Sequence, residues 1–109
     1  MVQFTYQDIK FNIVNCHLHH VEDEENIRCY EIKSILKWIS FNTNEEDFVA
    51  FLGDFNAQPF SDSYNHIIGE KYFSIHFNLN GEEPKNTFHN KMNAPHKDDA
   101  PEGTFDYIL

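Results

Sequence analysis

The chain has 109 residues, which is enough for one domain with one hydrophobic core. Hydrophobic residues make up 40% of the chain and aromatic residues 16%, a composition that excludes intrinsic disorder. Eighteen acidic residues against eight basic ones give a formal charge of −10. Because Lys and Arg form no cluster, the electrostatic pattern of a passive nucleic-acid-binding protein is missing, and a polyanionic substrate would need a metal ion.

The two cysteines do not indicate a secreted framework. Cys16 and Cys29 are too far apart for a C-x-x-C motif, and two cysteines do not establish a disulfide scaffold. The sequence shows no apolar run of membrane-span length, no signal peptide and no Asn-x-Ser/Thr sequon. The compartment stays open, and a reduced, intracellular environment is preferred over export.

The first half of the chain predicts a hairpin, a strand and a long helix. Apolar and polar residues alternate over residues 2–6 and 10–18 on either side of Gln7-Asp8, which predicts a β-hairpin whose second strand is buried. That strand ends in His17-Leu18-His19-His20. From Glu22 to Asn42 the apolar residues fall at helical spacing behind a run of acids, which predicts a helix.

The stretch from Phe48 to Pro59 is the one around which the chain is organised. Its five leading apolar residues are too few for a helix and predict a strand buried on both faces. With the preceding strand and helix it makes a βαβ unit. Gly53 ends the strand, and Asp54 and Asn56 follow. Ligands bind at the carboxyl ends of such strands, but the same residues also make ordinary turns, so the tetrapeptide alone leaves both interpretations open.

Shorter elements follow Pro59. Ser61 predicts the N-cap of a helix over residues 62–68 that Gly69 ends. Residues 72–79 are apolar and aromatic without a clear assignment, and residues 80–84 indicate a turn. Residues 86–89 predict a short strand, residues 90–103 a long polar loop, and residues 104–109 a final strand.

Four polar residues lie at predicted strand ends, and their motifs resemble one superfamily. The motifs are Asn15-Cys16-His17-Leu18, Gly53-Asp54-Phe55-Asn56 and Phe105-Asp106-Tyr107-Ile108. In this order they resemble the endonuclease/exonuclease/phosphatase superfamily, which has the deoxyribonuclease I-like fold. The resemblance extends through Asn26, Arg28, Trp38-Ile39, Asn56 to Pro59 and Asn86-Thr87-Phe88, and so covers nearly the whole chain. It is specific for the superfamily and not for a substrate.

The resemblance implies an α/β (α+β) chain that is part of a four-layer α/β-sandwich, and a metal-dependent phosphoester hydrolase. His17 matches a histidine that contacts the scissile phosphate, and Asp54 matches the carboxylate that orients or deprotonates the attacking water. Asn56 matches a carboxamide that holds a phosphoryl oxygen, and Asp106 matches an acid that orients a later histidine. The implied cofactor is Mg²⁺ or Mn²⁺, with Asp54 and Asn56 as contributing ligands.

The chain also departs from the superfamily pattern. The metal-binding glutamate and asparagine of the first half have no counterpart here, nor does the Ser-Asp-His segment that follows the last motif. We therefore expect residues 1–109 to be a single partial domain, truncated at both ends, and catalytically dead or nearly so on its own. The phosphoester substrate, which could be a nucleic acid, a lipid head group or a small phosphate, stays open.

The sequence is also compatible with an inactive module and with a zinc site. A catalytically inactive remnant or interaction module is the alternative, because half of a two-sheet fold leaves an apolar sheet face through which the chain would self-associate or pair with its missing half. His17 and His19 share a strand face and could form a zinc pair, but no second motif accompanies them. Arg28 is expected to pair with the acids beside it, in preference to reaching a phosphate. We expect His19 and His20 to have no special role, and Trp38 and the phenylalanines to lie in the core.

Overall fold

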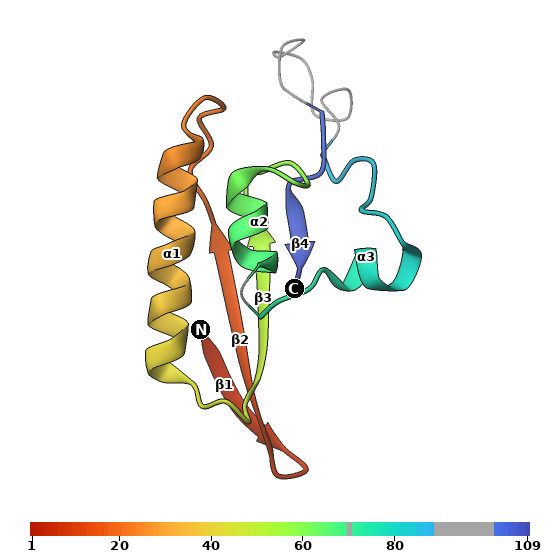
Figure 1. The fold of residues 1–109 in the computed structure, drawn as a ribbon. Coiled ribbons are helices and arrows are strands. Elements are labelled where there is room, and N and C mark those ends of the chain that lie inside the picture. The colour runs from red at the N-terminus through yellow and green to blue at the C-terminus, as the bar shows by residue number, and fades with distance from the viewer. Residues whose placement is uncertain (70, 89–101) are drawn as a thin grey trace.

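The structure is a computed structural model that describes residues 1–69, 71–88 and 102–109 (Figure 1). Its elements are β1 (Val2–Tyr6), β2 (Ile9–His17), α1 (Glu25–Asn42), β3 (Phe48–Asp54), α2 (Asp62–Ile68), α3 (Ile75–Asn80) and β4 (Asp106–Ile108). The strands form one sheet in the order β1-β2-β3-β4, in which β2 and β3 are parallel and the outer pairs are antiparallel. The mixed α/β fold and the β2–α1–β3 unit confirm the sequence-based prediction. No helix in the described part of the chain is long and apolar enough to cross a membrane.

The predicted hairpin is present and has a two-residue turn. Gln7 and Asp8 both have left-handed backbone angles, with φ of 48° and 63°. Two consecutive left-handed residues give a turn whose twist matches that of the flanking strands. The turn therefore sets the register in which Phe4 lies opposite Phe11, and their rings stack with centroids 5.1 Å apart.

Helix α1 begins later than predicted. The acids Glu22 and Glu24 precede the helix, and Glu25 is the acidic residue of its first turn. The reason is tertiary: the guanidinium of Arg28 binds the backbone carbonyls of His19, Val21 and Glu22, which holds the segment before the helix in an irregular path. The favourable interaction of acids with a helix N-terminus does not outweigh these bonds.

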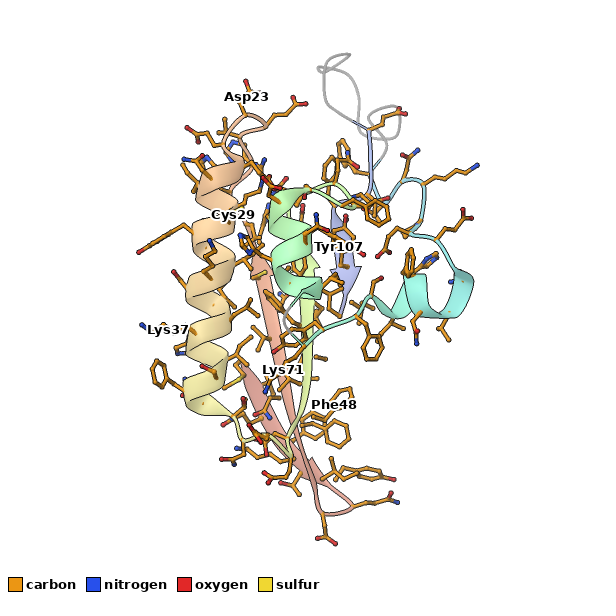
Figure 2. All side chains as sticks on the ribbon, viewed as in Figure 1. Asp23, Cys29, Lys37, Phe48, Lys71 and Tyr107 are labelled. Carbon is orange, nitrogen blue, oxygen red and sulfur yellow. The ribbon has the colours of Figure 1, made fainter. Side chains whose placement is uncertain are left out.

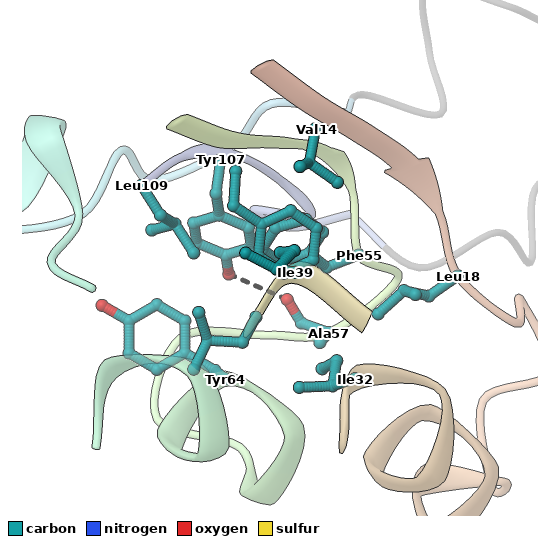
Figure 3. Packing of buried hydrophobic residues seen from close by; sticks show 11 residues of the cluster. Val14, Leu18, Ile32, Ile39, Phe55, Ala57, Tyr64, Tyr107 and Leu109 are labelled. Atoms are coloured by element: carbon teal, nitrogen blue, oxygen red, sulfur yellow. Dashed lines mark hydrogen bonds between the residues drawn. The ribbon is translucent and has the colours of Figure 1, made fainter. Parts of the chain in front are cut away.

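The core lies between the sheet and the two helices α1 and α2, which cover one sheet face (Figure 3). Fully buried side chains from three elements meet there: Phe51 of β3, Ile32 of α1 and Ile67 of α2, with Phe55 just after β3. The buried phenol of Tyr107 in β4 donates to the carbonyls of Ala57, at 2.8 Å, and Thr104, at 3.0 Å. This side chain therefore fixes the loop after β3 to the last strand.

The opposite sheet face is open, and the exposed side chains correct the expectations that β3 is buried on both faces and that Trp38 and the phenylalanines lie in the core. Strand β3 is not buried on both faces, because Phe48, at the end of β3 nearest the hairpin (Figure 2), is 47% exposed. The side chains on this open face alternate with those of the core and are apolar along most of its length. Those that are exposed are Val2, Phe4, Tyr6, Ile9, Phe48 and Ile108. Trp38 is also exposed, on α1, and Phe51 and Phe55 are the buried phenylalanines among the described residues.

The remaining elements are shorter than the sequence suggested. The unassigned residues 72–79 contain most of α3, which Ser74 caps and Gly81 ends with a left-handed φ of 81°. In place of a strand at residues 86–89, Phe88 forms an isolated bridge with Gly103; His89 and residues 90–101, which belong to the predicted polar loop, lie outside the described residues. The predicted helix with its Ser61 cap and its end at Gly69 is confirmed as α2.

Candidate active site

Three strand ends place three of the candidate residues in one row. In the sheet register His17 of β2 lies opposite Asp54 of β3, and Asp54 lies opposite Asp106 of β4. Directly opposed residues project from the same face of a sheet. His17 Nε2 is 3.7 Å from Asp54 Oδ2. The structure therefore brings together an imidazole and two carboxylates that are far apart in the sequence, at one end of the open face.

Gly53 allows this close approach of β2 and β3. Its φ is +136°, an angle that L side chains rarely adopt. A Cβ atom built at Gly53 would lie 1.9 Å from the carbonyl oxygen of Cys16 on the neighbouring strand. Glycine is therefore required here by both conformation and space, as its position at the end of the predicted strand suggested.

Asp54 and Asn56 are fixed by hydrogen bonds to each other and to Leu18, the residue that follows β2. The backbone N–H of Asn56 donates to Asp54 Oδ1 at 2.9 Å, and Asn56 itself has a left-handed φ of 47°. Asn56 Nδ2 donates to the carbonyl of Leu18 at 2.8 Å, and the N–H of Leu18 donates to the carbonyl of Asp54 at 2.9 Å. The turn and the candidate site therefore do not exclude each other: Asp54 Oδ1 accepts the hydrogen bond of the turn, and Asp54 Oδ2 faces His17.

Asp106 is positioned by the segment that contains Thr87. The hydroxyl oxygen of Thr87 accepts hydrogen bonds from the N–H groups of Phe105, at 2.9 Å, and Asp106, at 3.1 Å. The N–H of Phe55 donates to the carbonyl of Phe105 at 2.7 Å. Through these bonds the residues just before β4 are held beside the loop that follows β3.

A cavity of about 450 Å³ opens at this end of the sheet. It is lined by the carboxylates of Asp54, Asp106, Glu22 and Glu25, by polar and cationic side chains and by two aromatic rings. The other lining residues are His20, Arg28, Asn56, Ala57, Gln58, Ser61, Phe88 and Phe105. His17 is not part of the lining; its side chain is 71% exposed and lies beside Asp54 on the open face. The structure thus brings Asp54, Asn56 and Asp106 around one cavity and leaves His17 at its edge.

Arg28 is a buried structural cation. Only 5% of its side chain is exposed, and it pairs with Glu25, whose Oε2 lies 2.8 Å from both Nε and Nη2. The other oxygen of Glu25 accepts from the N–H and the hydroxyl of Ser63, at 2.7 Å and 2.6 Å. Burial alone would raise the pKa of Glu25, but the hydrogen bonds from Ser63 and Arg28 outweigh it and hold that pKa below its usual value. The expectation that Arg28 pairs with neighbouring acids is confirmed.

The zinc pair considered from the sequence is not formed. His17 lies beside Asp54, whereas the ring of His19 pairs with Glu24. Burial, with the nearby charges of Glu31 and Asp54, raises the pKa of Cys16 to about 12, so this thiol stays protonated and is no nucleophile at neutral pH. Across residues 1–69, 71–88 and 102–109, no group of three or more His, Cys, Asp or Glu side chains is arranged to hold a metal ion.

Solved structures of TDP2 (tyrosyl-DNA phosphodiesterase 2) are similar to this chain. D. rerio TDP2 complexed with a single-strand DNA product has a TM-score of 0.73 at 22% identity, covering 97% of this chain and 43% of that one. A D. rerio TDP2 humanised by 14 mutations has a TM-score of 0.70 at 22% identity, covering 97% and 41%. Truncated Caenorhabditis elegans TDP2 has a TM-score of 0.71 at 15% identity, covering 97% and 42%. No family model and no curated protein matches the sequence.

The chain has the deoxyribonuclease I-like fold of these structures. The resemblance drawn from its motifs is thereby confirmed at the level of the fold. The chain spans less than half the length of the TDP2 chains it matches.

The carboxylates at the ends of β3 and β4 suit an open mode of metal binding. The described residues build no closed cage of three or more such ligands. Mg²⁺, however, is usually bound by one or two carboxylates together with water and substrate phosphate. Asp54 and Asp106 lie opposite each other on one sheet face, and the repulsion between directly opposed like charges favours a cation between them. The pair therefore fits Mg²⁺ or Mn²⁺ in that open mode.

Sequence reasoning missed three groups of this site. His20 was given no special role, yet it lines the cavity with Asp54 and Asp106. Phe105, beside the Asp106 motif, also lines it, and Thr87 of the Asn86-Thr87-Phe88 segment fixes the start of β4. The proximity of His20 and Phe105 to the motif residues was the available signal, but their orientation depends on contacts between segments far apart in the sequence.

Proposed function

We propose that this chain contributes part of the active site of a metal-dependent phosphoester hydrolase, with nucleic-acid phosphodiesters as the substrate class. The observation that carries the proposal is the row His17, Asp54, Asp106 across three neighbouring strands, next to a cavity lined by Asn56. An imidazole and a carboxylate, with a second carboxylate beside them, are the groups that activate water and handle protons in phosphoester hydrolysis.

Each residue of the row has a role that follows from its surroundings. One oxygen of Asp54 accepts from the N–H of Asn56, so its other oxygen is the one that orients or deprotonates a water molecule. His17, exposed beside that oxygen, is the group that contacts the phosphate or donates a proton to it. The resemblance assigns Asp106 to orienting a further histidine. A bound divalent ion would neutralise the phosphate charge and polarise its oxygens.

The cavity and the charge of the chain favour the end of a nucleic acid strand over a long duplex. Phe88 and Phe105 give the cavity aromatic surfaces on which a nucleobase can stack. The formal charge of −10 opposes the binding of many consecutive phosphates. One of the similar TDP2 structures holds a single-strand DNA product, which supports the same substrate class.

The first experiment measures metal binding, because it does not require turnover. Mn²⁺ is titrated into isotopically labelled protein, and NMR line broadening is mapped along the chain. We expect broadening concentrated at His17, Asp54 and Asp106, and its loss in Asp54→Asn. The matched control is Asp62→Asn, which removes an exposed carboxylate on α2 that lines a separate groove. Broadening spread evenly over the acidic surface, and unchanged by Asp54→Asn, would overturn the proposal.

The second experiment measures hydrolysis of bis(p-nitrophenyl) phosphate with Mg²⁺ or Mn²⁺. We expect little or no turnover by the 109-residue chain, since residues of a catalytic unit lose activity together when part of the unit is absent. Any turnover should disappear in Asp54→Asn and persist in Asp62→Asn. The open apolar sheet face favours one alternative, a catalytically inactive interaction module of the same fold. A folded chain that binds neither Mn²⁺ nor phosphate at this site would support that alternative.

A further inference from the structure

The loop between β2 and α1 is held at nearly every residue except His20. The backbone of Leu18 is bonded to β3 and to Asn56, as described above. The N–H of His19 donates to Glu31 Oε2 at 2.9 Å. Arg28 Nη1 donates to the carbonyls of His19, at 3.3 Å, and Val21, at 2.6 Å, which are the residues on either side of His20. The backbone around His20 is therefore fixed, and with it the point from which the side chain leaves the loop.

The ring of His20 is also supported from its own side. It packs against the ring of His19, with centroids 5.6 Å apart and an angle of 44° between the planes. The ring of His19 is in turn held by the carboxylate of Glu24. His20 is exposed and lines the cavity that contains Asp54, Asn56 and Asp106. The arrangement presents one imidazole to that cavity on a rigid support.

A phosphate in this cavity needs hydrogen-bond donors, and most of the donors are already in use. Among the described residues that line the cavity, Arg28 is the lone Lys or Arg, and its N–H groups are bonded to Glu25 and to backbone carbonyls. One of the two side-chain N–H groups of Asn56 is bonded to the carbonyl of Leu18. No hydrogen bond found among the described residues uses the ring nitrogens of His20. The His20 ring is therefore a donor left for a phosphate, beside the amide groups of Asn56 and Gln58, and it comes from the loop side of the cavity.

We propose that His20 is a further substrate-contacting residue, whose ring donates a hydrogen bond to a phosphate oxygen in this cavity. The proposal rests on the proposed function for the identity of the ligand, a phosphoester. A charged or neutral imidazole N–H to a phosphate oxygen is a charge-assisted bond, the stronger class of hydrogen bond. His20 would therefore bind the substrate from the loop side while Asp54 acts from the strand side.

The test uses dimethyl phosphate and inorganic phosphate as probes, with Mg²⁺ present. Ring resonances of the histidines are followed by NMR during the titration. We expect shifts at His20 and none of that size at His66, which lines a different groove, or at His76, whose Nδ1 lies 2.9 Å from the carbonyl of Glu82. His20→Phe keeps an aromatic ring and removes both ring nitrogens, so it should weaken phosphate binding about tenfold, whereas His66→Phe should leave it unchanged. His20→Arg keeps a donor and should bind within about threefold of the original chain.

The outcomes separate this proposal from the proposed function. If His20→Phe binds phosphate as His66→Phe does, or if the chain binds no phosphate, His20 has no substrate contact. Loss of Mn²⁺ binding in Asp54→Asn would then still support the hydrolase. Tenfold weaker phosphate binding in His20→Phe, with Mn²⁺ broadening spread evenly and unchanged by Asp54→Asn, would support the phosphate contact and overturn the hydrolase. Because His20 is exposed, its replacement should not disturb the core. Unchanged NMR signals of the core residues would show that the variants are folded.

Discussion

Replacing Arg28 by methionine tests whether one buried cation holds the site loop. Arg28 is 4% exposed and binds Glu25 and three backbone carbonyls. Removing one partner of a buried ion pair costs about 3 to 5 kcal/mol, because the other charge stays behind. Here the side chain of Glu25 is 30% exposed and keeps its bonds from Ser63, and water can reach part of the loop. We therefore expect the lower end of that range, about 3 kcal/mol.

The assay is urea unfolding followed by circular dichroism. The matched control is Lys33→Met, which removes an exposed cation from the same helix and should change the free energy of unfolding by less than about 0.5 kcal/mol. Combining Arg28→Met with Glu25→Gln should cost less than the sum of the two single changes, because the charge left unpaired is removed as well. If Arg28→Met costs no more than Lys33→Met, the hydrogen bonds of Arg28 contribute no net stability and the reasoning is wrong.

Three further predictions concern the strands, the site and the loop. Gly53→Ala should lower the free energy of unfolding by more than about 2 kcal/mol, because φ is +136° and the new Cβ would meet the Cys16 carbonyl. The control is Gly81→Ala, at a left-handed residue in open space, which should lower it by about 1 kcal/mol. Equal losses for the two variants would contradict this interpretation. Glu25 has a lowered pKa in the fold, so its contribution to stability is complete above the unfolded carboxyl's pKa of about 4.3 and is lost as pH falls through the lower folded pKa. Unfolding midpoints measured from about pH 6 to pH 3 should therefore fall less steeply in Glu25→Gln, and parallel curves would contradict the assignment. Tyr107→Phe leaves the carbonyls of Ala57 and Thr104 without their donor and should cost about 1 to 2 kcal/mol in urea unfolding, against no measurable loss for the exposed Tyr30→Phe.

The elements that could be predicted from the sequence are those with a local signal. Alternation around Gln7-Asp8 predicted the hairpin, helical spacing predicted α1, and Ser61 and Gly69 predicted both ends of α2. The helix α3 has comparable signals in Ser74 and Gly81, but none of its six residues is buried. A helix with no buried face does not need apolar residues at every third or fourth position, so residues 72–79 carried no helical pattern.

The predictions that failed depend on contacts between distant segments. The start of α1 is set by Arg28 and not by the acids before it, and the exposure of Phe48 and Trp38 follows from which surfaces the helices cover. The candidate residues His17, Asp54, Asn56 and Asp106 were selected by resemblance to a superfamily. Their adjacency, by contrast, comes from the pairing of β3 with β4, which no local pattern encodes, and their chemical roles stay predictions.

The two edges of the sheet differ in a way that should be visible in its local opening. All five residues of β1 are exposed, whereas β4 is fixed by the buried Tyr107 and by the paired backbones of Phe51 and Leu109. Segments with little buried surface open at a small free energy, without global unfolding. Amide hydrogens of β1 should therefore exchange early, while Phe51, Phe55 and Leu109 should exchange late. Strand β1 can then detach from β2 and pair with it again while Asp54 and Asp106 keep their separation, so opening of this edge need not disturb the geometry at the other.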